Sequence, residues 1–389
     1  TYQSFPDDSI FHQLTGESSK DLNMDLRLLF RADKGPLDFK TDGQIILLYG
    51  DSVKSTRTLG EVAPGYEQLF GRLPDDARRW WDLTTVIEDE GKKAVIARLD
   101  RLSVGYTVND YSIRFGRQAI TWGNGLMYTP MDIVNPFDPT QVDTEYKSGD
   151  DMLYGQYLKA NGDDIQAAYV VRRNPVTAAV EFDQSTLAVK YHGFAGALEY
   201  DVLAASQYGD ALLAVGGSGD LGGAVWRSDI VLSATDKDSV IAQFVLNSSY
   251  SWVWGGKNWT GSAEYYFNGF GQQNGCYSPS CLAHNPELVK RVARRQLFTL
   301  GRHYLGGSLS IEATPLFTVT PNLFWNLGDD SALLQIVTQN SLRDNLVLLG
   351  ALTIPIGADC TEYGGIETEV PDAYFSSDLS LFLQLGWYF

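Results

Sequence analysis

Large apolar side chains occur at every second position in many segments of the chain. The C-terminal segment shows this most plainly, with the apolar set Leu379, Leu381, Leu383, Leu385, Trp387 and Phe389. Successive side chains of a β-strand point to opposite sides, so a period of two places these residues on one face. We therefore predict a strand over 376–389 with one apolar face.

This segment ends on an aromatic residue that belongs to the apolar face. The pattern resembles the C-terminal signal of bacterial outer-membrane β-barrels, in which the terminal Phe and the alternate apolar residues before it are bound by the assembly machinery. The resemblance implies that Leu385, Trp387 and Phe389 form an assembly signal and that the protein resides in the bacterial outer membrane. A half-buried edge strand of a soluble sandwich is the alternative, which the repetition of the pattern along the chain disfavours.

The segment 21–32 indicates which face of the sheet meets lipid. One face carries Asp25, Arg27 and Arg31, and the other carries Leu22, Met24, Leu26, Leu28 and Phe30. An arginine that faces lipid at the middle of the membrane costs a barrel about 2–4 kcal/mol. We therefore expect the charged face to line a polar lumen. We expect residues 21–389 to form a single barrel domain that follows an N-terminal periplasmic segment, 1–20.

Alternating segments separated by polar turns follow one another at the spacing of tilted membrane strands. We predict strands over 21–32, 37–50, 80–88, 94–106, 109–122, 151–161, 164–173, 185–193, 196–206, 209–217, 222–233, 239–252, 257–269, 298–313, 316–326, 331–340, 345–356 and 376–389. The fold class is all-β, a closed antiparallel transmembrane β-barrel of about 18 strands. The segment 80–88 completes an even number, as bacterial barrels require, and a ring of about 16 strands is the alternative.

The barrel is oriented by Phe389, which we expect at the periplasmic end. The connections 123–150, 270–297 and 357–375 then lie outside the cell, while the turns at 107–108, 161–163 and 341–344 face the periplasm. Long outer loops and tight periplasmic turns are the usual asymmetry. The segment 51–79, with the apolar Tyr66, Leu69 and Phe70, is a periplasmic excursion if 80–88 is a strand, and is extracellular if 80–88 belongs to a loop.

The connection 123–150 is too apolar to stand in water. Its apolar residues are Leu126, Met127, Met131, Ile133, Val134 and Phe137, and it also contains Pro130, Pro136 and Pro139. Proline disfavours strand pairing, so this connection is not expected to extend the sheet. We predict that it folds into the barrel as an inward-folded extracellular loop; a loop that only seals the mouth is the alternative.

Motifs around this connection carry a second resemblance. Gly116-Arg117-Gln118, the stretch from Trp122 to Gly125 and the stretch from Pro130 to Pro136 are similar to a porin-like family of outer-membrane proteins without an assigned substrate. In that family a strand ending in Gly-Arg-Gln leads to an inward-folded loop. The resemblance implies a constriction loop with Asp132, Asn135, Phe137 and Asp138. It also implies negative charge from Asp132, Asp138, Asp143 and Glu145 opposite Arg98 and Arg114.

Polar side chains on the inner faces of the strands are the candidates to line a pore. They are Arg98, Asp100, Arg114, Gln118, Lys190, Arg227, Glu264 and Arg302. Rings of charge set ion preference in channels, whereas a salt-bridged interior without selectivity is the alternative. Arg117 falls on the face opposite Arg114 unless a bulge near Gly116 shifts the register.

Composition excludes several classes of function. The chain has 30 Lys and Arg against 48 Asp and Glu, a net charge of −18, which disfavours nucleic-acid binding. No stretch of about 18 consecutive apolar residues occurs, which excludes a helical membrane span. The four histidines lie beside no nucleophile motif and the three cysteines lack the paired spacing of a zinc site, so we expect no enzyme activity, no metal and no cofactor.

Cysteine usage fits export. Cys276 and Cys281 lie in one predicted outer loop, and an exported chain meets an oxidising periplasm. We predict a disulfide between them, with a bond from Cys360 to either one as the alternative.

Together these features predict an outer-membrane channel for passive diffusion of small solutes, narrowed by 123–150, because a barrel of this size leaves an aqueous lumen. The alternative is a barrel that binds and transfers lipids or other hydrophobic molecules, with a periplasmic partner docked on 51–79. The expected partners are outer-membrane lipid, lipopolysaccharide contacted by the basic run 285–296, the barrel assembly machinery, and a small-molecule or lipid cargo.

Overall fold

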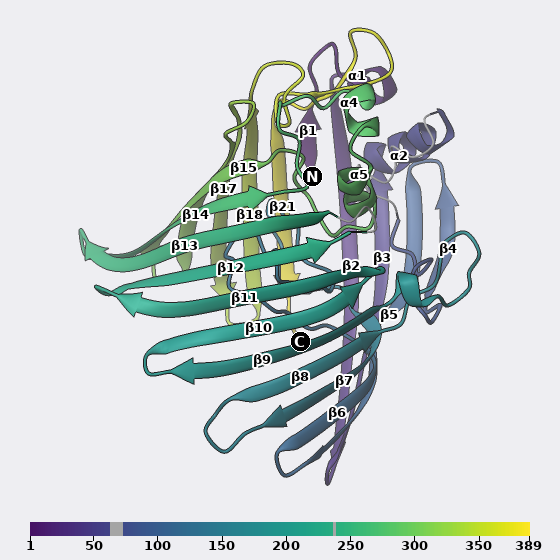
Figure 1. The fold of residues 1–389 in the computed structure, drawn as a ribbon. Helices are drawn as coiled ribbons and strands as arrows, with labels where there is room; N and C mark the ends of the chain where they lie inside the picture. Colours follow the sequence, from purple (N-terminus) through teal and green to yellow (C-terminus); the bar gives the residue numbers. More distant parts are fainter. Residues whose placement is uncertain (63–72, 236–238) are drawn as a thin grey trace.

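The strands of the computed structural model form one antiparallel sheet that curls into a barrel (Figure 1). The structure describes residues 1–62, 73–235 and 239–389. Its main sheet has 19 strands, of which 18 close the ring and one, β4, lies on the edge of β5. The predicted closed antiparallel barrel of 18 strands is therefore confirmed.

The bounds of the elements agree with most of the predicted ranges. The ring strands are β1 (Tyr2–Ser4), β2 (Ser18–Lys34), β3 (Leu37–Gly50), β5 (Lys93–Val108), β6 (Tyr111–Gln118), β7 (Asp150–Leu158), β8 (Asp164–Val170), β9 (Thr186–Ala195), β10 (Leu198–Gln207), β11 (Asp210–Leu221), β12 (Ala224–Ala234), β13 (Val240–Trp254), β14 (Lys257–Asn268), β15 (His303–Thr314), β16 (Phe317–Asn326), β17 (Ser331–Arg343), β18 (Leu346–Ile356) and β21 (Ser380–Trp387). The remaining elements are β4 (Thr84–Glu90), β19 (Ile366–Glu367), β20 (Tyr374–Phe375), α1 (Ile10–Thr15), α2 (Asp51–Val62), α4 (Pro279–Ala283), α5 (Pro286–Ala293) and a 3₁₀ turn at Phe182–Gln184. Within the described ranges, no helix is both long enough and apolar enough to cross a membrane.

The two faces of the sheet differ as the alternation predicts. On β11, Leu213 and Val215 are 62% and 56% exposed, whereas Leu212 and Ala214 between and beside them are 5% and 2% exposed. The exposed face is the outer face of the ring, which in a membrane contacts lipid. The buried face is the opposite, inner face of the ring.

Aromatic side chains gather on the outer face near one end of the barrel. Tyr111 stacks on Tyr157 across β6 and β7, and the rings of Trp252 and Trp259 stack across β13 and β14. Trp387 contacts Phe389 at the C-terminal end of β21. Aromatic girdles mark the membrane interfaces of outer-membrane barrels, so this band marks one interface.

The same end of the barrel carries the tight turns. The connections at 35–36, 109–110, 159–163, 196–197, 222–223, 255–256, 315–316 and 344–345 all lie there, together with Phe389. Gly222 and Gly223, like Gly255 and Gly256, have positive φ angles, as two-residue hairpin turns require. The opposite end carries the long connections 119–149, 171–185, 269–302 and 357–379. This is the predicted asymmetry, and with Phe389 at the periplasm the long connections lie outside.

The N-terminal segment lies at the long-loop end, which corrects one expectation. β1 pairs with Lys20 of β2 on one side and with Leu381 of β21 on the other, so it closes the ring far from Phe389. Residues 1–20 and Phe389 therefore cannot both be periplasmic. With Phe389 at the periplasm, residues 1–17 are on the outer side, because β2 runs from that end towards the tight turns.

The strand predicted over 80–88 is also corrected. A strand exists, at Thr84–Glu90, but it does not cross the barrel as one of the 18 ring strands, since β1 completes that number. β3 occupies one edge of β5 along Lys93–Tyr106. β6 and β4 share the other edge, β6 along Leu102–Val108 and β4 along Lys93–Arg98. β4 thus takes the place of β6 beside β5 at the outer end of the wall.

The segment 51–79 accordingly begins at the outer end and is not a periplasmic excursion. The N–H of Gly50 donates to the carbonyl of Lys92 in the β4–β5 turn at 2.8 Å. Asp51 at the start of α2 pairs with Lys92, and Arg57 pairs with Asp89. Tyr66, Leu69 and Phe70 lie outside the described residues.

A buried group of ions joins this segment to the wall. Arg117 is 1% exposed, and its guanidinium donates to Asp151 at 2.8 Å and to Asp76 at 3.0 Å. The carbonyl of Trp81 accepts a third bond at 2.7 Å. The pairing of β6 shows no bulge at Gly116. Arg117 is therefore removed from lipid by residues 76–81, which cover it, and not by a change of register.

Native Cys360 allows the orientation to be measured, because it is exposed and free in the connection 357–379. We expect a membrane-impermeant maleimide to label intact cells at Cys360, and Cys360→Ser to abolish the label. In that background, Lys54→Cys on α2 should be labelled in intact cells. Asp344→Cys in a tight turn should be labelled only after permeabilisation, and labelling of it in intact cells would reverse the orientation.

The ion group at Arg117 gives a stability prediction. Replacing Arg117 by Met leaves the buried carboxylate of Asp151 without its ion partner and takes one of two cations from Asp76, which costs about 3–5 kcal/mol. We expect the free energy of unfolding, measured by urea titration in lipid, to fall by this amount. Arg343→Met, at an exposed turn, is the matched control and should change it by less than about 0.5 kcal/mol. Equal effects of the two substitutions would contradict the role of the ion group.

Candidate functional site

The connection between β6 and β7, residues 119–149, is the candidate site and is called the β6–β7 loop below. The predicted strand 109–122 ends at Gln118, earlier than expected. Gly116 has a φ of 124°, and a Cβ there would lie 2.1 Å from the carbonyl oxygen of Leu102. Only glycine therefore fits where β6 approaches β5 this closely. β7 begins at Asp150, directly opposite Gln118, so the loop leaves and rejoins the wall at one level.

Apolar residues of the loop pack against apolar residues on the buried face of the wall. Trp122, Met131, Ile133 and Val134 form one buried cluster with residues of β7 to β12, including Met152, Val170, Ala188, Leu203, Ala214 and Val231. Tyr128 joins a second cluster with Val245, Tyr266, Tyr304 and Phe324 of β13 to β16. These contacts remove the apolar residues of the loop from water, as their composition requires.

Glu264 on β14 holds the tip of the loop. Its side chain accepts hydrogen bonds from the backbone N–H groups of Leu126, Met127 and Tyr128 at 2.6, 3.0 and 2.7 Å. Asn247 on β13 donates a fourth bond at 3.0 Å. Glu264 is 2% exposed. Hydrogen bonds to a charged group are stronger than neutral ones, so these bonds make Glu264 the main polar anchor of the loop.

Asp229 on β12 makes a second anchor. It accepts the backbone N–H of Asn124 at 2.7 Å and the side-chain amide of the same residue at 2.8 Å. The amide of Asn124 also lies 3.3 Å from Asp201 on β10, which pairs with Lys190 at 2.9 Å. The side chain of one loop residue thus connects two strands.

Further contacts fasten the rest of the loop to other strands. The partners are Gln166 on β8 with Trp122, Gln207 on β10 with the carbonyl of Ile133, Gln335 on β17 with the carbonyl of Thr140, and Gln384 on β21 with Asp143, at 2.7 to 2.8 Å. The hydroxyl of Tyr388 donates to Glu145 at 2.7 Å. The guanidinium of Arg27 on β2 stacks on Tyr146, 3.5 Å from the ring centroid.

The four residues proposed for the constriction have separate roles. Asp132 is buried in an ion pair with Lys147 of the same loop, with an oxygen 2.6 Å from the ammonium group. Burial raises the pKa of Asp132 to about 6. Asp138 accepts bonds from the N–H and hydroxyl of Thr140, Asn135 donates to the carbonyl of Ser148, and Phe137 lines a cavity described below.

The four carboxylates expected to place negative charge opposite Arg98 and Arg114 have partners within the protein. Asp132 is neutralised by Lys147, and Asp143 and Glu145 are bonded to Gln384 and Tyr388 of the C-terminal segment. The carboxylates of the loop are used as structural acceptors, which the sequence did not reveal.

The residues predicted to line a pore all have polar partners. Arg98 donates to Gln44 at 2.5 Å and lies 3.3 Å from Asp100; Arg114 lies 3.6 Å from Asp38; Lys190 pairs with Asp201; Arg227 donates to Ser249 at 3.1 Å; Arg302 donates to the carbonyl of Gly271; and Gln118 donates to the carbonyl of Arg114. Four of them, Asp100, Gln118, Lys190 and Glu264, are buried. The network corresponds to the alternative of a salt-bridged interior.

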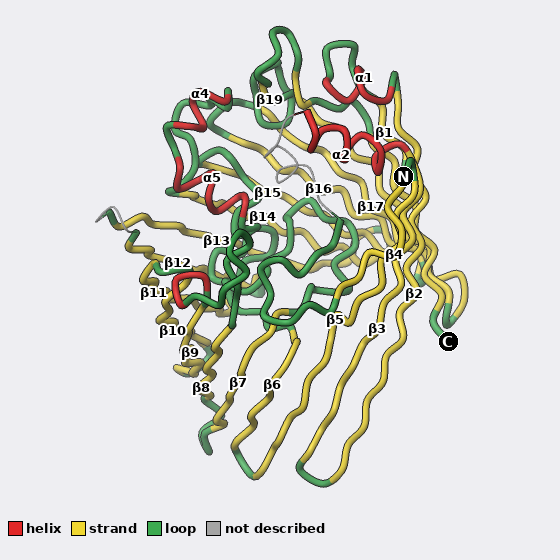
Figure 2. The backbone as a smooth tube through the Cα atoms, turned by 90° about the vertical axis from the view of Figure 1, so that its right-hand side faces the viewer, coloured by secondary structure: helices red, strands yellow, loops and turns green. Residues whose placement is uncertain are grey.

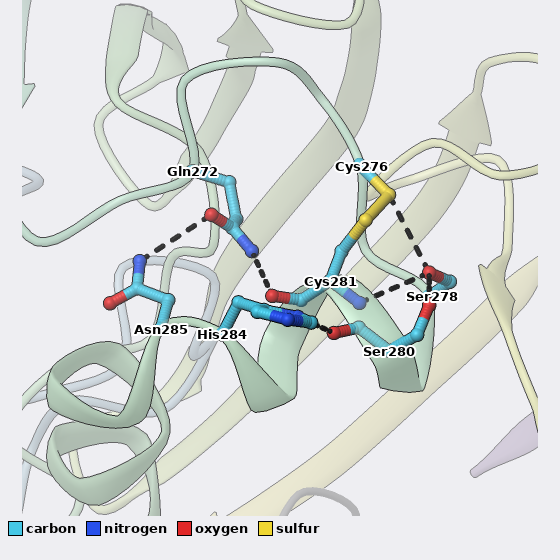
Figure 3. Close-up of a disulfide and its surroundings, with 7 residues drawn as sticks. All are labelled: Gln272, Cys276, Ser278, Ser280, Cys281, His284 and Asn285. Atoms are coloured by element: carbon cyan, nitrogen blue, oxygen red, sulfur yellow. Dashed lines mark hydrogen bonds between the residues drawn. A yellow bond between two sulfur atoms is a disulfide. The ribbon is translucent and has the colours of Figure 1, made fainter.

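The connection 269–302 lies beside the loop at the outer end and contains the predicted disulfide. Cys276 and Cys281 are bonded to each other, and Ser278 between them caps the N–H of Cys281 (Figure 3). Gln272 donates to the carbonyl of Cys281 at 3.0 Å, which ties the disulfide turn to the start of the connection. On α5, Arg291 pairs with Asp210 at the β10–β11 turn and stacks on Phe270, so this cation is directed at the rim of the barrel.

A cavity of about 780 Å³ lies between three outer connections and is called the outer cavity. The β6–β7 loop, the connection 269–302 and the connection 357–379 all line it. One lining residue, Glu362, accepts the N–H of Leu300 at 2.8 Å, the hydroxyl of Tyr304 at 2.5 Å and the amide of Asn326 at 2.7 Å. Burial raises the pKa of Glu362 to about 7. This residue joins the connection 357–379 to the strands beneath it.

The comparisons with known proteins find likeness in structure only. No protein-family model matches the chain, and no curated protein matches its sequence. Similar solved structures include Wzi of Escherichia coli, a carbohydrate-binding β-barrel of the outer membrane involved in group 1 capsule assembly, with a TM-score of 0.54 and 10% identity over 99% of this chain and 80% of that one. They also include OccAB2 of Acinetobacter baumannii (0.52, 9%, over 95% and 92%) and OccD3 (OpdP) of Pseudomonas aeruginosa (0.50, 8%, over 95% and 86%).

At these identities the likeness is one of fold. The similarity covers nearly the whole of this chain, so the neighbours share the fold described above. The protein is a closed, antiparallel, porin-like β-barrel of the bacterial outer membrane.

Proposed function

We propose that the barrel is a channel for the passive diffusion of small solutes and that the β6–β7 loop folds into its lumen and narrows it. One observation carries the proposal: the loop contacts inward-facing side chains of strands all round the ring. These side chains are Arg27 on β2, Gln166 on β8, Asp201 on β10, Asp229 on β12, Asn247 on β13, Glu264 on β14, Gln335 on β17 and Gln384 on β21.

The distribution of these contacts supports a crossing of the lumen. β8 to β14 form one side of the ring, whereas β17, β18, β21, β1 and β2 follow one another on the other side. A segment fastened to both sides has to pass between them. Figure 2 agrees with this, since loop backbone lies between the group of strands around β8 to β12 and the group around β2 to β5.

The chemistry of the inner wall favours water-soluble solutes. The wall beneath the loop carries charged and amide side chains in bonded pairs, such as Arg98 with Asp100 and Arg114 with Asp38. An apolar cargo would have to pass these groups and strip them of water, which is costly. The transfer of lipids is also less supported, because α2, at the start of the segment proposed to dock a periplasmic partner, lies at the outer end of the barrel.

We also propose that the C-terminal strand is recognised during biogenesis. Leu385, Trp387 and Phe389 are 61%, 66% and 83% exposed on one face of β21. This exposure supports their recognition by the assembly machinery before lipid covers them.

Releasing the tip of the loop should widen the channel. Glu264→Gln replaces a carboxylate oxygen by an NH₂ group that cannot accept from the backbone of Leu126–Tyr128, and each lost charge-assisted bond costs about 1.5–3 kcal/mol. We expect single-channel recordings in planar bilayers to show larger and noisier openings. A deletion within 124–148 should give a conductance at least as large as that of Glu264→Gln.

Glu312→Gln is the matched control. Glu312 on β15 accepts a bond from Asn258 on β14 near the tight turn at 315–316, at the end of the barrel opposite the β6–β7 loop. The conductance of the Glu312→Gln variant should equal that of the wild type. If the deletion and Glu264→Gln both leave conductance unchanged, the loop does not narrow the lumen.

Arg114 should influence which ions pass. Arg114→Ala removes a cation from the wall and leaves Asp38 without this partner. Because the local charge becomes more negative, we expect the reversal potential in a salt gradient to move towards cation preference. Arg343→Ala, at the end of β17 beside a tight turn, is the control, and an unchanged reversal potential for Arg114→Ala would place that residue off the permeation path.

A further inference from the structure

β1 closes the ring between β2 and β21 only at the outer end (Figure 1). It has three residues, and Thr1 before it exchanges backbone hydrogen bonds with Asp21 at 2.7 and 2.9 Å. Towards the periplasm β2 continues to Lys34 and β21 to Trp387. Within the described ranges of the chain, no strand pairing joins β2 to β21 there. We call the space between these two edges the β2–β21 slot.

The slot has a defined width and direction at its outer end. β1 lies between β2 and β21 and pairs with both, so the two strands are separated there by about 9–10 Å, two strand spacings. β1 is antiparallel to both, so β2 and β21 run parallel to each other. A strand that continued the line of β1 would therefore be antiparallel to both edges, as β1 is. β1 blocks the outer end of the slot, and the periplasmic end is open.

Backbone groups of alternate residues point into the slot. On β2, Asp21 bonds to Thr1, so the odd-numbered residues direct their N–H and carbonyl groups to this side. On the other edge, the N–H of Tyr388 donates to Asn345 on the side of β18, so the odd-numbered residues of β21 direct theirs to the slot. The residues concerned are Asn23, Asp25, Arg27, Leu29, Leu383, Leu385 and Trp387.

These backbone groups lie at the depth of the lipid-facing belt. Their neighbours Leu22, Met24 and Leu26 are exposed on the outer face of β2, as Leu383 and Leu385 are on β21. Unpaired N–H and carbonyl groups are costly in hydrocarbon, which is why membrane sheets are closed. An acyl chain has neither a donor nor an acceptor. Lipid can therefore fill the slot but cannot satisfy its edges, whereas an extended polypeptide can do both.

The stretch 143–146 of the β6–β7 loop contacts both edges of the slot. Asp143 accepts a bond from Gln384 on β21 at 2.8 Å, and Tyr146 stacks under the guanidinium of Arg27 on β2. The loop thus holds the two edges at a fixed spacing. The Nη1 atom of Arg27 is buried and has no hydrogen-bond partner among the described residues. This edge of the slot therefore also offers an unused side-chain donor.

We propose that the β2–β21 slot binds an extended strand of a partner polypeptide, which enters from the periplasm and completes the wall by pairing with both edges. Addition of a strand to a free sheet edge is a common mode of peptide recognition. Alternation sets the chemistry of the strand. Its side chains opposite Met24 and Leu26 face lipid and are apolar, and those opposite Asp25 and Arg27 are polar, with a hydrogen-bond acceptor beside Arg27.

A second polypeptide is the source of this strand because of the connections at the open end. The described connections of the chain at the periplasmic end are all tight turns, as at 35–36, 109–110 and 344–345. Each turn joins two strands that are already paired in the wall. None of them can supply a further strand to the slot.

A synthetic strand tests the slot in the purified barrel in detergent. The peptide has about ten residues of alternating valine and serine, the length of a membrane strand. It carries one cysteine, activated as a thiopyridyl disulfide, in place of the valine level with Leu26. In the Cys360→Ser background, Leu26→Cys supplies the thiol, and released thiopyridone measures the rate of disulfide exchange. Leu26 bonds through its backbone to β3, so it faces the added strand as a non-hydrogen-bonded pair, in which side chains are closest.

Ile45→Cys is the matched control. Ile45 lies beside Leu26 at the same depth and on the same exposed face, but β2 and β5 occupy both edges of its strand. Each rate is divided by the rate with free thiopyridyl cysteine, which corrects for thiol reactivity. We expect the corrected rate at Leu26→Cys to be about tenfold higher or more. A peptide N-methylated along its backbone cannot donate to the edges and should react at both positions at the lower rate.

Two results of this experiment overturn the proposal. One is an equal corrected rate at Leu26→Cys and Ile45→Cys, and the other is an equal rate of the plain and N-methylated peptides at Leu26→Cys. Either result means that the peptide adsorbs to the apolar belt without pairing. Circular dichroism should show that both variants fold as the wild type does.

Direct closure of the slot by its own edges is tested separately. Met24 and Leu385 lie at one level on the two sides of the slot, in the register that β1 sets. In the Cys360→Ser background, Met24→Cys together with Leu385→Cys should form no disulfide in oxidised glutathione. A disulfide formed without peptide would show that β2 and β21 pair with each other, and it would overturn the slot. None of these measurements depends on conductance.

Discussion

Buried backbone N–H and carbonyl groups need hydrogen-bond partners, and this requirement governs the structure. In the wall the sheet meets that need, and closure by β1 gives the edges of β2 and β21 partners near the outer end. The β6–β7 loop has no ladder of its own, so its N–H and carbonyl groups depend on side chains of the wall. Glu264 accepts three successive N–H groups, while Gln207 and Gln335 donate to loop carbonyls. The inward polar residues are therefore partly a binding surface for the protein's own chain.

This dependence explains what the sequence could predict. A period of two is a local signal, so the long strands and the outward face were predictable from residues such as Leu381 and Leu383. β1 has only three residues, which is too few to show a period of two. β4 alternates like a strand that crosses the membrane, although it is only about half as long as one. The predicted number of 18 ring strands was therefore right, but β1 completes the ring and the segment 80–88 does not.

The site was less predictable because its contacts join distant parts of the chain. Glu264 was recognisable as an inward residue from its own strand, but its partners are 136 to 138 positions away. The pairing of Asp132 with Lys147 was equally hidden, since nothing in the loop's composition distinguishes a carboxylate that faces a lumen from one that holds a turn. The disulfide was predictable because its two residues are near each other and the compartment is oxidising.

Charge neutralisation along the wall and loop shifts the question of selectivity to the few groups that remain unpaired. A bonded pair such as Lys190 with Asp201 has a weak field at a distance, because its charges cancel within a few ångströms. An unpaired guanidinium keeps its full charge and can exchange water for a ligand. Arg227 and Arg302 donate instead to the neutral hydroxyl of Ser249 and the carbonyl of Gly271, so these partners do not cancel their charges. Any ion preference of the proposed channel would therefore depend on such cations more than on the bonded pairs.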